Sequence, residues 1–250
     1  MKPIGHLLQV LPTIDSTNNY AMGLIQQGLA AHGTAIFALE QSAGKGQRGK
    51  EWKSTPGENI MISIIYENIP LSIDQQFLFA ASIALGTYDF FNSFAGEPTF
   101  IKWPNDILWR DRKSVGILIE NKISADTQKW NWSVVGIGIN INQTQFPPTS
   151  TKAVSLKQIT GKNWDVIELS RILCQHLQNR WQWMQKSSAE TIMTAYNTEL
   201  FKRGQMAKFL HQGKFIESLV VQVNADGLLE TENNGQIQQF QVGEITWQYD

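Results

Sequence analysis

The sequence predicts an α+β protein with one large domain followed by a small unit built only of strands. Short strand-like runs bounded by turn residues alternate irregularly with longer segments of helical periodicity, and no strand–helix pattern repeats. Beyond Arg203-Gly204 only short strands follow. With 250 residues, 42% of them hydrophobic, the chain can bury a substantial core. We expect domains at 1–203 and 204–250.

The large domain is expected to combine a sheet with several covering helices. Ser16 and Thr17 occupy the N-cap position of a helix that Gly28 ends, and a strand follows at about 34–39. A second helix at about 74–94 carries apolar residues on one face and is expected to cover the sheet. Further strands are expected at about 59–66, 99–103, 107–109, 115–121 and 132–141, and further helices at 165–186 and 189–200.

The C-terminal unit is expected to be a small barrel-like domain. Its strands are predicted at about 206–210, 215–223, 228–231 and 237–242. The connections carry turn dipeptides of the kind that close hairpins, namely Gln212-Gly213, Asp226-Gly227 and Asn234-Gly235.

Composition argues against several classes of protein. The net charge of −1 gives no overall attraction to nucleic acid, and no apolar run is long enough to cross a bilayer. The single cysteine, Cys174, falls in an apolar helical stripe, so a core thiol is expected rather than a nucleophile. The four histidines lack the spacing of metal ligands. We expect a cytoplasmic protein that binds neither nucleic acid nor membrane.

A glycine-rich loop, Gly44-Lys45-Gly46-Gln47-Arg48-Gly49, is the first candidate site. Its glycines let the backbone approach a phosphate, and its cations suit an anionic ligand. The loop matches the dinucleotide pattern G-x-G-x-x-G, but the residues up to Pro56-Gly57 leave no room for the helix that this motif requires. It also nearly matches the Walker A pattern, but Glu51 stands where Ser or Thr would bind magnesium. A solvated glycine turn is the plain alternative.

A second motif, Lys102-Trp103-Pro104-Asn105-Asp106, follows a short predicted strand. Pro104 removes a backbone donor and restricts Trp103 to extended geometry, so the strand must end there. A lysine at a strand end can place its ammonium between a carboxylate and the α-phosphate of ATP, which would otherwise repel each other. The combination of both motifs indicates activation of a carboxylate by ATP. Trp52, just after the loop, is expected to stack on adenine, with core packing as the alternative.

With these motifs in view, the chain resembles the biotin protein ligases, also called biotin–acetyl-CoA-carboxylase ligases, over essentially its whole length. The marks that carry the resemblance recur in the family's order. They are Asp15-Ser16-Thr17-Asn18, Gln41 with Gly44 to Gly49 and Trp52, Lys102 to Asp106, Lys113 through Gly116 to Glu120, Gly136 to Asn140, and Gly243-Glu244-Ile245. The resemblance implies a mixed-sheet catalytic domain related to class II aminoacyl-tRNA synthetases, followed by an SH3-like barrel.

The resemblance also implies roles for individual residues. Lys102, Lys45 and Asp106 would be catalytic. Biotin would be bound by Ser16, Thr17, Asn18, Gln41, Gly44, Lys45, Lys102, Gly116 and Gly138. ATP and the adenylate would be bound by Gly46, Gln47, Arg48, Gly49, Trp52, Asn105 and Asn140. The ligands of a metal ion remain unassigned.

The implied activity is formation of biotinyl-5′-adenylate from biotin and ATP with Mg²⁺, followed by transfer of biotin to a lysine of the biotin carboxyl carrier protein. A homodimer through paired sheet edges stays open. The family commonly carries arginine where this chain has Lys45 and Gln47. Lysine keeps the charge but loses the bidentate fork, and Gln47 loses the charge, which bears on how tightly the loop retains the adenylate.

Three alternatives accompany this interpretation. Lipoate ligation shares the fold and the two-step chemistry, but the chain lacks the arginine-led glycine run and the His-Asp pair of that family. A biotin-responsive repressor is disfavoured because the residues before Ser16 are too few for a helix-turn-helix module, so we expect the short form of the ligase. A biotin-binding protein without transfer activity is the third, prompted by Gln47.

Overall fold

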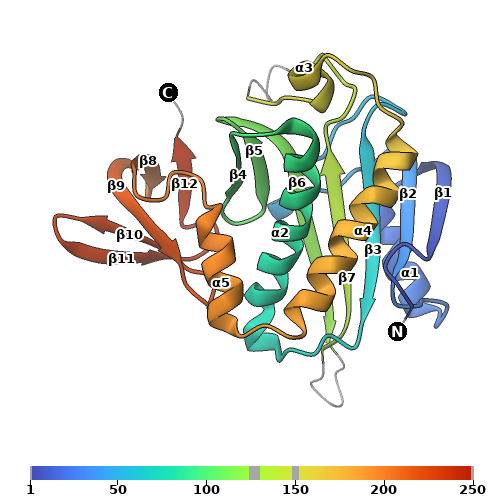
Figure 1. Cartoon of the computed structure of the whole chain (residues 1–250), viewed down its shortest axis with the longest axis horizontal. Helices are drawn as coiled ribbons and strands as arrows, with labels where there is room; N and C mark the ends of the chain where they lie inside the picture. The colour runs from blue at the N-terminus through green and yellow to red at the C-terminus, as the bar shows by residue number, and fades with distance from the viewer. Residues whose placement is uncertain (1, 124–129, 148–151, 249–250) are drawn as a thin grey trace.

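The computed structural model describes residues 2–123, 130–147 and 152–248. Its larger part is a seven-stranded mixed sheet in the order β1-β2-β3-β7-β6-β5-β4 (Figure 1). The strands are β1 (Leu7–Ile14), β2 (Thr34–Gln41), β3 (Ile60–Glu67), β4 (Thr99–Lys102), β5 (Asp106–Trp109), β6 (Arg112–Ile123) and β7 (Trp130–Ile139). Only β1 and β2 pair in parallel, and all other neighbours are antiparallel. The predicted α+β class with a mixed sheet is confirmed.

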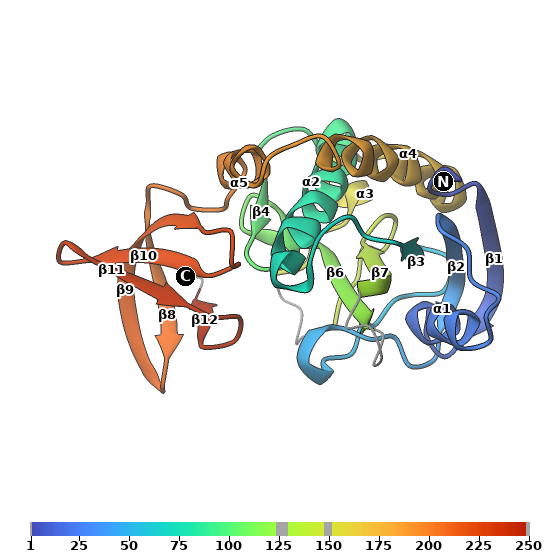
Figure 2. The same cartoon turned by 90° about the horizontal axis from the view of Figure 1, so that it is seen from below.

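The helices cover the two faces of this sheet unequally. Figure 2 shows α2 (Gln76–Ala95), α4 (Val166–Met184) and α5 (Ala189–Thr198) along one face and α1 (Thr17–Gln26) on the other. The short α3 (Leu156–Thr160) lies near one end of the sheet (Figure 1). The main core forms between the sheet and α2 and α4, whereas α1 packs on a smaller cluster with Ile36, Ile65 and Val134. Part of the α1 face is therefore left for a site.

Local sequence accounts for these helices. The carboxylate of Asp165 accepts hydrogen bonds from the first backbone amides of α4, and an apolar stripe faces the core. Helix α2 is buried on most of its circumference because it packs on the sheet between α4 and α5, and Gly96 with φ of 67° ends it. Helix α1 starts after Ser16 and ends before Gly28, as predicted.

The C-terminal unit is a five-stranded antiparallel sheet with the order β11-β10-β9-β8-β12. Its strands are β8 (Met206–His211), β9 (Lys214–Val223), β10 (Leu229–Asn233), β11 (Gln236–Phe240) and β12 (Ile245–Gln248). Within the described residues β11 and β12 remain the two edges of an open sheet, so the predicted closure into a barrel is not confirmed. The domain boundary at 203/204 stays a prediction.

The two sheets are joined by buried contacts. The indole Nε1 of Trp103 donates to the carbonyl oxygen of Gly227 at 2.9 Å, and the Asn197 side chain bonds both the N–H and the C=O of Val223. Buried residues of both units, such as Leu200 and Phe209, belong to one continuous cluster. These bonds satisfy polar groups inside that cluster and fix the C-terminal sheet beside β4.

The sequence-based prediction of the elements was right for most of the chain and incomplete at three places. All strands and long helices expected from apolar patterns are present with small shifts at their ends. The strands β1 and β12 and the helix α3 were not expected. In the described residues no helix has the length and apolar character that a membrane span requires.

A buried imidazole gives a prediction for the pH dependence of stability. His32 packs between the rings of Tyr66 and Trp181, with centroids 5.8 and 5.3 Å away, and its Nδ1 accepts from the Glu67 amide at 3.2 Å. Burial lowers the pKa of His32 below its ordinary value of 6.5. The unfolded chain therefore binds a proton more readily, and the free energy of unfolding should fall as pH drops below about 6.5.

Urea unfolding between about pH 7.5 and 5 tests this assignment. His32→Phe removes the titrating group while keeping an aromatic ring, so its stability should depend less on pH than that of the wild type. His211→Phe, in the C-terminal sheet, is the control for losing a histidine. A wild type that loses no more stability than His32→Phe on acidification would contradict the prediction.

Candidate active site

The register of the large sheet aligns the site in one row. Met61 of β3 faces Gly138 of β7, Gly138 faces Gly116 of β6, Gly116 faces Asp106 of β5, and Asp106 faces Lys102 of β4. Directly opposed residues of antiparallel strands project to the same face. The row therefore brings the Lys102 motif and the predicted biotin-binding glycines to one surface.

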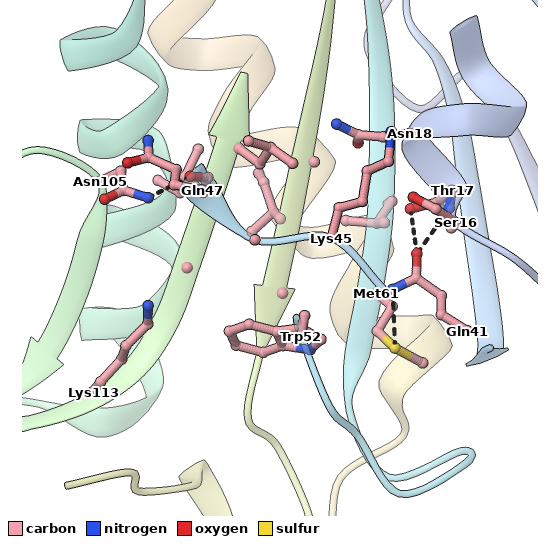
Figure 3. Close-up of a pocket in the computed structure, with 18 residues that line it drawn as sticks. Ser16, Thr17, Asn18, Gln41, Lys45, Gln47, Trp52, Met61, Asn105 and Lys113 are labelled. Atoms are coloured by element: carbon pink, nitrogen blue, oxygen red, sulfur yellow. Dashed lines mark hydrogen bonds between the residues drawn. The ribbon is translucent and has the colours of Figure 1, made fainter. Parts of the chain in front are cut away.

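A cleft with about 480 Å³ of atom-free space, partly open to solvent, lies on this surface beside α1. Most of the predicted site residues line it, from the start of α1, the end of β2, the glycine loop, the turn before β5 and the strands β6 and β7 (Figure 3). They are Ser16, Thr17, Asn18, Gln41, Lys45, Gly46, Gln47, Trp52, Asn105, Gly116 and Gly138.

A polar corner closes one side of the cleft. The backbone N–H and the hydroxyl of Thr17 both donate to Gln41 Oε1, at 2.8 and 3.1 Å. The Gln41 Nε2 donates only weakly, to the sulfur of Met61 at 3.5 Å. Ser63 Oγ donates a hydrogen bond to Thr17 Oγ1 at 2.7 Å and thereby fixes the position of that hydroxyl. The corner thus offers an oriented amide donor and hydroxyl groups to a planar polar ligand.

Asn18 and Lys45 form the next wall. Asn18 Nδ2 donates to Glu120 Oε2 at 2.6 Å, and Lys45 Nζ lies 3.8 Å from Glu120 Oε1. The Lys45 side chain is 42% exposed, so this ion pair is screened by water and holds the ammonium only weakly. Gly136 leaves the space that Asn18 occupies, since a Cβ there would lie 3.0 Å from Asn18 Cγ.

The glycine loop folds as a narrow hairpin between β2 and β3. The Gly46 amide donates to the Lys50 carbonyl at 2.7 Å, and the Trp52 amide donates to the Gly44 carbonyl at 2.9 Å. Arg48 and Gly49 form the tip with φ of 56° and 75°. No crossover helix follows the loop, because the chain continues into the antiparallel β3. The rejection of the dinucleotide and Walker A patterns is confirmed on structural context.

Trp52 packs on the glycines of the row. A Cβ at Gly138 would lie 2.5 Å from Trp52 Cε2, and one at Gly116 would lie 3.0 Å from Cζ3. Figure 3 shows the indole lying across the middle of the cleft. Its Nε1 is buried and has no hydrogen-bond acceptor within the described chain. Trp52 therefore covers the row through the packing of its ring on the glycines.

A cluster of two lysines around one aspartate stands at the other end of the row. Asp106 Oδ2 lies 3.4 Å from Lys102 Nζ, and Asp106 Oδ1 lies 2.6 Å from Lys113 Nζ, although the latter pair lacks hydrogen-bond geometry. Lys102 and Asp106 are mostly buried, at 17% and 13% exposure. Lys113 lines the cleft and lies 5.9 Å from the Trp52 ring, so it connects the cluster to the cleft.

Several predicted residues lie outside the cleft lining. Gly44 supports Trp52 at the base of the loop, Gly49 is exposed at its tip, and Arg48 contacts Gly243 of the C-terminal unit. Asn140 is buried and directs its Nδ2 to the carbonyls of Lys113 and Val154, at 3.4 and 3.3 Å. Its contact with an adenylate, like the other ligand assignments, stays a prediction.

Sequence reasoning gave no role to several residues of the cleft, among them Met61, Lys113 and Gly136. Lys113 and Gly136 lie inside motifs that carry the family resemblance as whole segments, without a role for each residue. Met61 had no local signal, since its place follows from the pairing of β3 with β7. Every second residue of a strand faces the same side of the sheet, so Gly136 can be predicted to lie on the face of Gly138. Met61 lies on another strand and cannot be predicted in this way.

The fold that carries the cleft is the fold of the biotin protein ligases. The structure of the biotin protein ligase from Aquifex aeolicus in complex with biotin and ATP superposes with a TM-score of 0.80, covering 98% of this chain and all of that one at 24% identity. The chain belongs to the biotin/lipoate A/B protein ligase family, whose model matches residues 10–140.

Curated relatives agree with this family. A biotin–[acetyl-CoA-carboxylase] ligase of Paracoccus denitrificans is 33% identical over 182 residues, which are 69% of this chain and 72% of the relative. The bifunctional ligase/repressor BirA of Bacillus subtilis is 37% identical over 166 residues, which are 65% of this chain. The chain spans about half the length of that protein.

The contact of Trp52 with the row predicts how the loop responds to substitution. Gly138→Ala would place a methyl group inside the indole, so the ring and the loop must lift from the sheet. Trypsin cleavage after Lys45, Arg48 and Lys50 should then accelerate by about tenfold, because cleavage follows the population of the open loop. Peptide mapping by mass spectrometry measures it. Gly23→Ala, in α1 with no neighbour closer than 4.0 Å, is the control, and equal cleavage in both variants would contradict the packing argument.

Proposed function

We propose that the protein activates biotin with ATP and transfers it to a lysine of the biotin carboxyl carrier protein. A carboxylate oxygen of biotin attacks the α-phosphorus, a P–O bond forms, and pyrophosphate leaves. The ε-amine of the carrier lysine then attacks the acyl carbon of the adenylate, AMP leaves, and the amine loses a proton. The observation that carries the proposal is the single row that joins the polar corner and glycine floor to the lysine cluster.

The polar corner supports recognition of the ureido ring. A cyclic urea presents one carbonyl acceptor and two N–H donors in a plane. The Gln41 amide, the Ser16 and Thr17 hydroxyls and Asn18 supply complementary groups at the start of α1 and the end of β2. Gly116 and Gly138 have no side chain that would occupy the floor, and Trp52 supplies an apolar cover.

The cations support the meeting of two anions. Lys45 on the loop, Lys113 on the cleft wall and Lys102 behind it supply three ammonium groups at or near the cleft, where carboxylate and phosphate would be adjacent. Each ammonium is already paired with a carboxylate. An incoming phosphate would therefore replace that carboxylate as the partner of the ammonium group. Lys113 thereby joins Lys102 and Lys45 as a group expected to bind the phosphates.

Mg²⁺ is proposed to enter with the nucleotide. Across residues 2–123, 130–147 and 152–248 no group of three His, Cys, Asp or Glu side chains forms a metal cage. This suits Mg²⁺, which keeps water ligands and is held largely by substrate phosphates. The ion would supply charge neutralisation on the phosphates.

Asp106 is proposed to serve the second step. Its carboxylate is held between Lys102 and Lys113, next to the place where the acyl phosphate would form. Release of Lys102 or Lys113 to the phosphate would free a carboxylate oxygen to accept a hydrogen bond from the attacking amine and orient it.

The finer structural and cellular assignments belong to the same proposal. The open C-terminal sheet would correspond to an SH3-like barrel, and the large sheet to the fold related to class II aminoacyl-tRNA synthetases. The protein would act in the cytoplasm, and a homodimer through a sheet edge stays open.

Biotin-dependent exchange of labelled pyrophosphate into ATP tests the first step. Lys102→Ala should lower the exchange rate by about 10²–10³, because a preorganised charge-stabilising group has that typical value. Lys122→Ala, which removes a lysine from the outer part of β6, is the control and should keep the rate. Exchange that runs with lipoate and not with biotin would identify a lipoate ligase, and normal exchange in Lys102→Ala would overturn the role of Lys102.

Gln47 gives a separate prediction about retention of the adenylate. Gln47→Arg adds a guanidinium at the cleft wall, so release of labelled adenylate should slow by about fivefold, in line with roughly 1 kcal/mol for one charge-assisted contact. Rapid gel filtration of the preformed complex measures the release. Gln185→Arg, at the far end of α4, adds the same charge away from the cleft and should change nothing. Equal release from both variants would show that position 47 does not contact the adenylate.

A further inference from the structure

The motif Gly243-Glu244-Ile245 has no role in the proposed function, yet the structure brings it to the glycine loop. The guanidinium of Arg48, at the tip of the loop, lies directly against Gly243. A Cβ at Gly243 would stand 2.6 Å from Arg48 Nη2 and closer still to Nη1 and Cζ. A Cβ on residue 243 would displace the guanidinium from this position.

The turn that contains Gly243 is held in place by hydrogen bonds within the turn and by a buried neighbour. The Glu244 amide donates to the Gln241 carbonyl at 3.1 Å, and Glu244 Oε2 accepts from the Gln241 amide at 2.7 Å. Gly243 itself has φ of 93°, which side-chain-bearing residues rarely adopt. Ile245 follows in β12 and is buried. The turn is thus closed on itself and anchored in the C-terminal core.

The C-terminal sheet is in turn fixed to the catalytic sheet next to the lysine motif. Trp103, the neighbour of Lys102, bonds the Gly227 carbonyl, and a Cβ at Gly227 would lie 2.6 Å from the Phe77 ring at the start of α2. The loop is therefore held at two places: Trp52 packs on the catalytic sheet, and Arg48 contacts the C-terminal sheet. Both contacts depend on glycines that accept a large side chain.

We propose that Gly243 is a positioning residue of the site, which docks the tip of the glycine loop through Arg48 and so sets how long the adenylate is retained. The effect on adenylate retention rests on the proposed function. The contact between Arg48 and Gly243 is present in the ligand-free chain. It gives the C-terminal unit a part in the first step of the reaction, although none of the described residues of that unit lines the cleft.

The experiment measures release of labelled biotinyl-adenylate from the full chain. Gly243→Ala should accelerate release by about tenfold, as loss of a loop contact shifts the open population. Gly213→Ala is the matched control, since that glycine also has a positive φ of 76° but no atom within 4 Å. The control should retain the adenylate as the wild type does, and a Gly243→Ala variant that behaves like the control would overturn the proposal.

A double-mutant cycle assigns the effect to the contact with Arg48. Arg48→Ala alone is expected to accelerate release, and Gly243→Ala should add nothing in that background. Additive effects would mean that Gly243 acts through something other than Arg48, which overturns the proposal. A wild-type chain that forms no adenylate would refute the proposed function instead.

A second measurement needs neither the adenylate nor a stable Gly243→Ala variant. In the ligand-free protein, Arg48→Ala should raise trypsin cleavage after Lys45 and Lys50, because the tip has lost its contact with the C-terminal unit. Arg171→Ala, on an exposed position of α4, is the control. Cleavage of the loop that is the same in both variants would show that Arg48 does not hold the loop.

Discussion

The register of β3, β7, β6, β5 and β4 is the constraint on which the site depends. It places Met61, Gly138, Gly116, Asp106 and Lys102 in one row on one face of the sheet. Because side chains alternate between faces, a slip of one residue would turn the glycines towards α2 and put Ile117 or Ile137 under Trp52. The apolar core behind the row fixes the register, so the packing of α2 and α4 determines the chemistry of the opposite face.

Patterns carried in the sequence were sufficient for the elements that bury continuous apolar runs. Strand β1 was not predicted because it is a half-exposed edge strand that contains Pro12. Its parallel partner β2 is separated from it in the sequence by α1. Strand β12 has only four residues. Its partner β8 is the first strand of the C-terminal unit, whereas β12 is the last, so the two are far apart in the sequence. Helix α3 is too short for periodicity, and the local sign of its start is the capping box of Ser155 and Gln158.

The candidate site was predictable to the extent that its residues stand in local motifs. The polar corner, the loop and the glycines converge on one cleft as expected, but their contacts depend on pairing between distant strands. Lys113 meets Asp106 only because β6 folds back on β5, and Asn140 turns its amide to the backbone of Lys113 and Val154. Residue type alone cannot distinguish a ligand-binding amide from one that satisfies a buried carbonyl, since both need the same donor.

The charges of the site are arranged so that the chain can fold before a ligand arrives. Two ammonium groups near one another would repel, and removing Lys102 from water costs free energy unless a counter-charge is present. Asp106 supplies that charge to Lys102 and Lys113, while Glu120 does so for Lys45 at the more exposed wall. In the proposed function an anionic substrate would compete with these carboxylates for the same ammonium groups. The selectivity of such a site would depend on geometry more than on net charge, because only a ligand that reaches Lys45 and the Lys102–Lys113 pair together replaces both carboxylates at once.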